Sequence, residues 1–252
     1  MTDLGGDQRA DWVIAPPRQA WVPIAGGGRF PVRRVYCVGR NYAEHIREMG
    51  GDERQPPFFF QKPADAIVHD GAAVPYPTLT KDLQHEIELV LAIRTGGSAI
   101  AEADAAAHVF GLAVGIDLTR RDLQVEARKA GRPWEIGKAF DHSAPIGLLR
   151  PLAGAALPVS GAISINVNGE TRQQADLGDM TWNAAEIVAQ LSRHYRLEPG
   201  DLIYTGTPAG VTAVAVGDRL EGRVADLPPL RITIAAPEDE AAPAERMLAD
   251  PA

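Results

Sequence analysis

Two apolar stretches in the first half of the chain have the pattern of buried β-strands. The first, 85–93, reads His-Glu-Ile-Glu-Leu-Val-Leu-Ala-Ile, and the second, 109–118, reads Val-Phe-Gly-Leu-Ala-Val-Gly-Ile-Asp-Leu. Because side chains alternate along a strand, Glu86 and Glu88 lie on one face, roughly 7 Å apart, and the intervening apolar residues on the other. Asp117 stands at the end of the second stretch. Acidic groups in strands this apolar need water, a proton, a basic partner or a metal cation.

These three carboxylates form a set of oxygen ligands. No cysteine and at most one histidine stand near them in the sequence, so the set suits Mg²⁺, Mn²⁺ or Ca²⁺ better than Zn²⁺. The alternative is a half-exposed strand with a polar face, in which water solvates the two glutamates.

The rest of the pattern predicts a β-rich α+β domain. Asn168-Gly169 between alternating segments predicts a β-hairpin over 163–173. Asn183 and Glu186 form a capping pair at the start of an amphipathic helix over 183–195. Strands outnumber β-α-β units, which argues against a doubly wound sheet. Two further helices are expected, over 99–108 and over 119–130. Thr119 and Asp122 would form a loose capping pair at the start of the second of these. Further strands are expected over 32–38, 58–60, 202–204, 219–224 and 230–234.

Composition narrows the function classes. The chain has 252 residues, of which 45% are hydrophobic, and a net charge of −8, which argues against nucleic-acid binding. Its single cysteine, Cys37, falls in an apolar strand and allows no internal disulfide. We see no signal peptide and no apolar run near the ~20 residues of a membrane span. The expectation is a soluble cytoplasmic protein that binds neither nucleic acid nor membranes.

Two further groups are candidates for acid–base chemistry. His45 and Glu48 lie three residues apart in a predicted short helix over 42–50, bounded by glycines as a hinged lid would be. A carboxylate beside an imidazole makes it a better general base. Lys138 stands among apolar neighbours and could stabilise an oxyanion. The alternatives are a surface pair and a lysine whose stem packs while its head reaches water.

Four polar residues are candidates for substrate binding. Gln124 follows Asp117 by about two helical turns. Arg40 and Tyr42 stand at the root of the predicted lid and could receive a carboxylate or carbonyl. Thr207 lies in the glycine-containing loop 205–210, whose N–H groups could hold a carboxylate. An ordinary turn or surface role is the alternative for each.

Taken together and in order, short motifs resemble the fumarylacetoacetate hydrolase family over about 35–234. The resemblance implies a mixed β-roll or sandwich with flanking short helices, usually dimeric. We therefore expect an N-terminal extension, partly loose, over 1–34, a catalytic domain over 35–234 and a disordered tail over 235–252. The matching segments are 36–42, 85–88, 115–124, 138–141 and 205–208.

The resemblance also implies roles for single residues. It makes Glu86, Glu88 and Asp117 ligands of Mg²⁺ or Mn²⁺, with Ca²⁺ as an in vitro substitute. Lys138 would help to stabilise an oxyanion or enolate. By the same resemblance, His45 and Glu48 form the lid dyad that activates water. Gln124 matches a substrate-contacting position of the family, and Thr207 matches another such position less closely.

Within the family, segments 58–65 and 131–134 are most similar to members that cleave 3-fumarylpyruvate in gentisate breakdown. The implied function is metal-dependent hydrolysis of a C–C bond in an acylpyruvate, a small 2-oxo acid, giving fumarate and pyruvate. One alternative is decarboxylation or tautomerisation of oxaloacetate at the same site. The other is a non-catalytic binding protein of the same fold.

Overall fold

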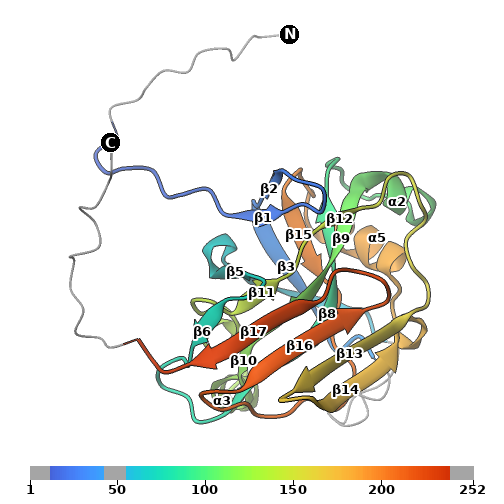
Figure 1. The fold of residues 1–252 in the computed structure, drawn as a ribbon. Helices are drawn as coiled ribbons and strands as arrows, with labels where there is room; N and C mark the ends of the chain where they lie inside the picture. The colour runs from blue at the N-terminus through green and yellow to red at the C-terminus, as the bar shows by residue number, and fades with distance from the viewer. Residues whose placement is uncertain (1–11, 43–54, 239–252) are drawn as a thin grey trace.

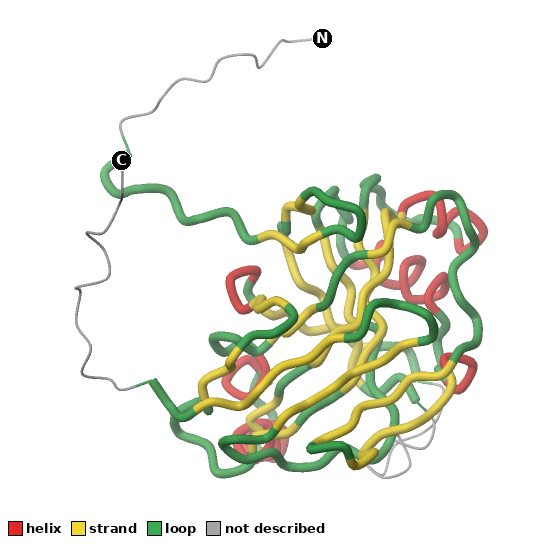
Figure 2. Tube along the Cα trace, viewed as in Figure 1, coloured by secondary structure: helices red, strands yellow, loops and turns green. Residues whose placement is uncertain are grey.

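The structure, a computed structural model, describes residues 12–42 and 55–238. Two β-sheets pack face to face, and short helices lie at their margins (Figures 1 and 2). The predicted β-rich α+β class is confirmed. The helices are α2 (Ala105–His108), α3 (Arg121–Lys129), α4 (Glu135–Lys138) and α5 (Ala184–His194), with 3₁₀ turns η1 (Ala64–Ala66), η2 (Glu102–Asp104) and η3 (Leu177–Asp179).

The larger sheet is mixed, and its central strands are buried on both faces. Its order is β4-β3-β15-β8-β9-β11-β5, with β12 paired to β9. On β8 the side chains of Leu89 and Leu91 enter one hydrophobic cluster and those of Val90 and Ala92 enter another. The strands are β3 (Arg34–Gly39), β4 (Phe58–Lys62), β5 (Ile67–His69), β8 (Ile87–Ile93), β9 (Val109–Ile116), β11 (Ala144–Ile146), β12 (Arg150–Pro151) and β15 (Asp201–Tyr204).

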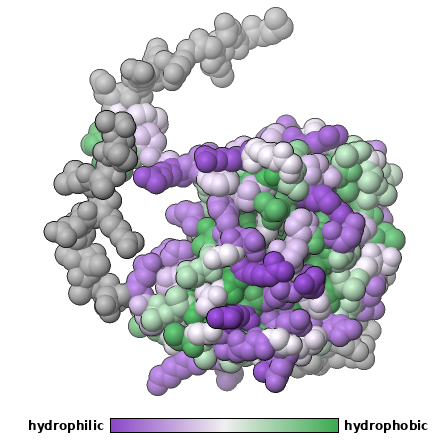
Figure 3. Space-filling view, viewed as in Figure 1, coloured by the Kyte–Doolittle hydropathy of each residue, from purple (hydrophilic) through white to green (hydrophobic). Residues whose placement is uncertain are grey.

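The smaller sheet covers one face of the larger one and exposes its other face. Gly222 permits the close contact: a Cβ there would lie 2.6 Å from Ile87 Cδ1. Polar side chains gather over β16 and β17 on the outer face (Figure 3), where Glu221 pairs with Arg223 and Arg231. The order is β14-β13-β16-β17-β6, formed by β6 (Ala73–Pro75), β13 (Ala162–Val167), β14 (Glu170–Asp176), β16 (Arg219–Val224) and β17 (Leu230–Ala235).

Local signals account for the elements that were predicted best. The Asn183 side chain accepts from two N–H groups at the start of α5, and Glu186 closes the capping box. Asn168 and Gly169 both have positive φ, at 54° and 85°, in the turn between β13 and β14. Both residues thus fit the φ-positive turn that suits a two-residue hairpin.

Two helix predictions need correction. Helix α3 begins at Arg121, not at Thr119, which lies in β10 (Thr119–Arg120) beside β7 (Leu83–Gln84). The predicted capping pair is wrong, because the Asp122 carboxylate accepts from the Thr80 hydroxyl and the Lys81 N–H instead. The segment 99–108 is helical only in η2 and α2.

The N-terminal part contains a small hairpin. Strands β1 (Trp21–Pro23) and β2 (Arg29–Pro31) pair antiparallel, and Val22 and Phe30 are buried in the second cluster, as is Cys37. Residues 12–19 run outward from the sheets (Figure 1). No helix within the described ranges has the length and apolar character needed to cross a bilayer.

Candidate active site

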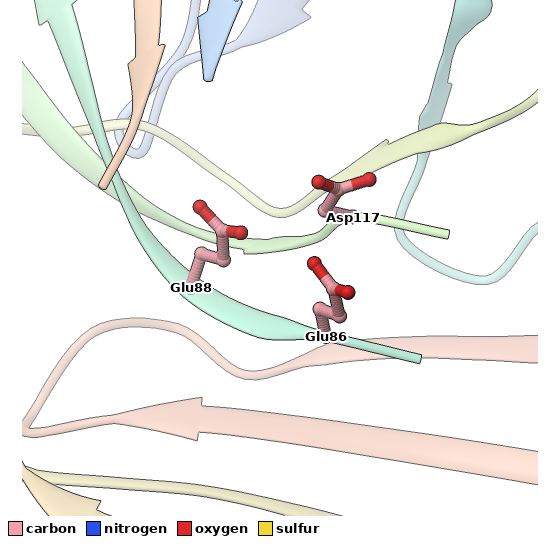
Figure 4. Close-up of side chains that lie close together, drawn as sticks. All are labelled: Glu86, Glu88 and Asp117. Atoms are coloured by element: carbon pink, nitrogen blue, oxygen red, sulfur yellow. The ribbon is translucent and has the colours of Figure 1, made fainter. Parts of the chain in front are cut away.

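Three acidic side chains meet at the ends of the two central strands. Glu86 immediately precedes β8, Glu88 is its second residue, and Asp117 follows β9. The strands pair Ile87 with Ile116, and the Asp117 N–H donates to the Glu86 carbonyl at 2.8 Å. One oxygen from each carboxylate therefore lies within 4.8 Å of the others (Figure 4). All three residues are at most 6% exposed, so the alternative of a water-solvated strand face is excluded.

The donor set fits a hard divalent cation. It supplies three oxygens, and an oxygen-only set is the one that Mg²⁺ and Mn²⁺ favour. Each carboxylate oxygen has two lone pairs, so a bond to a protein cation leaves room for a further contact. Glu86, Glu88 and Asp117 could therefore hold such an ion together.

Three cationic side chains form ion pairs with Glu86 and Asp117, two of these carboxylates. Lys138 Nζ, at the end of α4, lies 2.7 Å from Glu86 Oε2 and 2.7 Å from Asp117 Oδ2. Lys62 Nζ, at the end of β4, lies 2.8 Å from Asp117 Oδ1. Arg121, the first residue of α3, pairs with Glu86 Oε1. With all three carboxylates ionised, the six side chains have a net charge of zero.

Lys138 remains an ammonium group in this setting. Burial alone would lower its pKa, but the charges of Asp117 and Glu86 outweigh it, and the pKa is raised. Its Nζ also donates to the Thr119 hydroxyl at 2.7 Å. The sequence-based alternative, a head that reaches water, does not hold, since Lys138 is buried.

Glu88 differs from its two neighbours. Burial, followed by the charges of Asp117 and Glu86, raises the pKa of Glu88 well above its usual value. The Gly206 N–H donates to Glu88 Oε2 at 2.7 Å and opposes that rise. The loop after β15 thus presents an N–H to a carboxylate, as its glycines suggested, but this carboxylate belongs to the protein.

Most of the predicted substrate-binding residues line one small cavity beside the carboxylates. Arg40, Gln124 and Thr207 are brought there with Glu86 and Lys138. The Gln124 side chain is buried, and its Oε1 accepts from Arg121. The cavity is completed by Val38, Gly39, Phe60, Arg121 and Trp134.

Tyr42 does not line that cavity, but the charge of Glu88 acts on its hydroxyl. The residue is buried, and its hydroxyl has no hydrogen-bond partner among the described residues. Burial, followed by the charge of Glu88, raises the pKa of Tyr42. His45 and Glu48, the predicted dyad, lie outside the described residues.

Sequence reasoning missed Lys62 and Arg121 as contacts of the carboxylates. The weak signal for Lys62 was a lysine at the end of an aromatic strand, directly before Pro63. Arg121 stands three residues before Gln124, so the two share one side of a helix.

Known proteins resemble this chain in sequence and in overall structure. A fumarylpyruvate hydrolase from a Ralstonia species is 44% identical over 177 residues, which span 70% of this chain and 92% of that protein. The crystal structure of fumarylpyruvate hydrolase from Pseudomonas aeruginosa in complex with Mn²⁺ and pyruvate is similar, with a TM-score of 0.87. The two chains are 51% identical, and the match covers 90% of this chain and 100% of the Pseudomonas aeruginosa chain.

A second group of relatives carries another activity. The oxaloacetate tautomerase YcgM of Escherichia coli is 38% identical over 192 residues, covering 76% of this chain and 88% of that protein. The model of the fumarylacetoacetate (FAA) hydrolase C-terminal family matches residues 34–235. The chain therefore belongs to the fumarylacetoacetate hydrolase family.

Proposed function

We propose that the protein hydrolyses a C–C bond of an acylpyruvate, converting 3-fumarylpyruvate and water to fumarate and pyruvate. The observation that carries the proposal is the buried cluster of Glu86, Glu88 and Asp117, with Lys138 in contact with two of the three. Relatives named fumarylpyruvate hydrolase at 44% and 51% identity support this substrate.

The pyruvoyl end of the substrate binds at this cluster. Glu86, Glu88 and Asp117 hold a divalent ion, which supplies Lewis-acid stabilisation of negative charge on a 2-oxo acid. Lys138 lies beside the same carboxylates, where its ammonium group neutralises charge that develops as the C–C bond breaks. Gln124 and Thr207 orient the 2-oxo acid from the walls of the cavity.

The acyl end of the substrate extends into an adjoining aromatic hollow of about 760 Å³. Arg40, Phe60 and Trp134 line both spaces, so they form the boundary between them. Phe58 meets Trp134 edge to face with the ring centroids 5.0 Å apart, and such surfaces suit a flat, conjugated group.

Arg40 is placed to receive the distal carboxylate of a fumaryl group. Its Nε is buried and has no hydrogen-bond partner among the described residues. Burial and then the charge of Arg128 lower the pKa of Arg40, and an anionic ligand would offset this shift because it favours the charged guanidinium. A terminal carboxylate on the acyl group supplies that anion.

Water is activated by the predicted dyad. His45, oriented by Glu48, removes a proton from water, and the hydroxide adds to the acyl carbonyl carbon. The electron pair of the C–C bond passes to pyruvate as its enolate, which takes up a proton at C3. One water is consumed, and the products are one carboxylic acid and one pyruvate.

The test uses purified protein with Mn²⁺ or Mg²⁺ and 3-fumarylpyruvate. Diketone absorbance should fall, and pyruvate should appear in equal amount. Asp117→Asn serves as the matched inactive control. If the wild-type protein cleaves neither fumarylpyruvate nor acetylpyruvate, the reaction class is wrong; if it cleaves only acetylpyruvate, the substrate is wrong.

Oxaloacetate tautomerisation or decarboxylation is the second candidate, because tautomerase relatives match over 76% of the chain. Neither reaction needs an attacking water. His45→Ala should therefore reduce hydrolysis by a factor of about 10²–10⁴, the usual contribution of a general base, and affect oxaloacetate chemistry much less. Equal losses would count against the water-activating role.

Three finer features belong to the same proposal. We infer Mg²⁺ or Mn²⁺ as the ion in the cell, a homodimer as the assembly and the cytoplasm as the location. The Mn²⁺ in the Pseudomonas aeruginosa structure and the oxygen-only donor set support the choice of ion. Light scattering on the purified chain measures the mass, and a monomer would contradict the dimer.

A further inference from the structure

A buried glutamine of the smaller sheet reaches across to the candidate active site. Gln173 lies in β14 and is 1% exposed, although most of that strand faces solvent. Its side chain bonds to the segment that carries the acidic residues and to the loop that carries Thr207. One amide therefore joins two parts of the site that come from different strands.

The orientation of this amide follows from two partners of fixed chemistry. The Ile87 N–H can only donate, and it lies 3.1 Å from Gln173 Oε1. The Pro208 carbonyl can only accept, and it lies 2.8 Å from Gln173 Nε2. Oε1 and Nε2 cannot be exchanged without breaking both bonds.

The remaining two contacts are then fixed as well. His85 Nδ1, 2.9 Å from Gln173 Oε1, must be the donor. Thr207 Oγ1, 2.8 Å from Gln173 Nε2, must be the acceptor. All four hydrogen-bonding positions of the amide are used, two as acceptor and two as donor.

This arrangement decides what the Thr207 hydroxyl can offer. A hydroxyl has one proton that it can donate. Thr207 accepts a hydrogen bond from Gln173, so this proton is not used in the contact between the two side chains. Thr207 also lines the cavity beside Glu86 and Lys138. Its proton is thus available to an acceptor in that cavity, such as a carboxylate or enolate oxygen.

The loop that holds Thr207 is seated directly on β14, which is a second and independent observation. A Cβ at Gly210 would lie 2.3 Å from the Arg172 carbonyl and 3.4 Å from Gln173 Cα. Gly206, in the same loop, donates to Glu88. A change at Gln173 is therefore transmitted to Thr207 over a short and closely packed path.

We propose that Gln173 is a positioning residue that fixes the Thr207 hydroxyl as a hydrogen-bond donor to the bound 2-oxo acid. The identity of the ligand rests on the proposed function, whereas the coupling of the two side chains rests on the contacts above. Gln173 touches no substrate and acts through Thr207.

The test is a double-mutant cycle on oxalate binding, measured by calorimetry with the Mn²⁺-loaded protein. Gln173→Met removes both donors at similar volume, and Thr207→Val removes the hydroxyl. Each single change should weaken oxalate binding about tenfold, which corresponds to ~1.4 kcal/mol. In the Thr207→Val protein, Gln173→Met should add less than about a twofold loss, because the donor that it positions is already absent.

Gln174→Met is the matched control. Gln174 is the next residue along β14 and is exposed, so the same substitution there should leave oxalate binding unchanged. Thr207→Ser keeps the hydroxyl and should preserve the dependence on Gln173. If Gln173→Met does not fold, Gln173→Glu replaces it: the new carboxylate accepts the Thr207 proton, and an equal or larger loss of binding is expected.

The outcomes separate this proposal from the proposed function. Additive losses in the cycle, unchanged binding in Gln173→Met, or no oxalate binding by the wild-type protein would each overturn the positioning role. Reduced Mn²⁺ affinity in Gln173→Met would indicate a general structural effect and also count against it. A protein that shows the coupling but leaves fumarylpyruvate intact would overturn the proposed function alone.

Discussion

Lys62 Nζ lies 2.8 Å from Asp117 Oδ1, while Lys138 Nζ lies 2.7 Å from Oδ2 of the same carboxylate. Both lysines are 2% exposed. Lys62 also donates to the backbone carbonyls of Leu118 and Lys138. Lys62 thereby joins the segment after β9 to the end of α4. This one buried cation contacts both the Asp117 carboxylate and the backbone of Lys138, the second lysine that pairs with Asp117.

Replacing Lys62 by methionine should destabilise the fold markedly. The change leaves the buried Asp117 with less compensation and two carbonyls without their donor, and breaking a buried pair in this way costs ~3 kcal/mol or more. Equilibrium unfolding in urea measures the loss. Lys129→Met, at an exposed position of α3, is the control and should stay within ~0.5 kcal/mol of the wild type. Equal effects of the two changes would contradict an anchoring role for Lys62.

Two glycines with nearly the same backbone angle allow a sharper comparison. Gly206 has a φ of +94° and Gly217 a φ of +96°. A Cβ at Gly217 would meet nothing within 4 Å, whereas a Cβ at Gly206 would lie 2.7 Å from Asn41 Cβ. Gly217→Ala should cost ~1 kcal/mol for the left-handed backbone alone. Gly206→Ala should cost about 2 kcal/mol more for the overlap.

The two alanine variants should also differ in ion binding. The Gly206 N–H donates to Glu88, so a displaced loop weakens that contact, while Gly217 has no such role. Calorimetric titration with Mn²⁺ measures the difference. Similar losses of stability and of Mn²⁺ affinity in both variants would show that the close approach of Gly206 to Asn41 is unimportant.

A bound divalent ion should stabilise the protein through the three carboxylates. At a free concentration a hundredfold above its dissociation constant, Mn²⁺ should add ~2.7 kcal/mol to the free energy of unfolding, and EDTA should remove it. Asp117→Asn should abolish this increment. Asp122→Asn should retain it, because Asp122 bonds to Thr80 and Lys81 and is not one of the clustered carboxylates. An increment that survives in Asp117→Asn would place the ion elsewhere.

The elements that sequence predicted best are those whose signals are local. Helix α5 carries its cap at Asn183 and Glu186, and the β13–β14 hairpin carries its turn at Asn168-Gly169. The failed cap at Thr119 shows the limit. Asp122 is bonded to Thr80, 42 residues earlier, and no local pattern contains that partner.

The candidate site likewise contains residues with a local sequence signal and residues without one. Alternation along one strand was enough to place Glu86 and Glu88 together, since a strand fixes which side chains share a face. Lys62 and Gln173 lie on strands that are distant in the sequence, and the sequence pattern assigned neither residue a role at the site. Their contacts depend on how β4 and β14 are packed against the centre, which periodicity does not reveal.

Glu88 should make the metal-free protein less stable as the pH rises. Its folded-state pKa lies well above the usual value of 4.5, chiefly because of burial, so the folded protein holds that proton more tightly than the unfolded chain does. The stabilising effect is complete below pH 4.5 and is lost as the pH rises through the folded-state pKa. Within that window the loss approaches ~1.4 kcal/mol per pH unit.

Glu88→Gln isolates this effect, because the amide oxygen can still accept from the Gly206 N–H and carries no charge. Urea unfolding in EDTA should show that the free energy of unfolding of the variant, relative to that of the wild type, increases with pH from pH 5 upward. Mn²⁺ should reverse the order, since a divalent cation favours the ionised carboxylate and binds the variant less well. A difference between the two proteins that stays constant with pH would mean that Glu88 titrates normally despite its burial beside two other carboxylates.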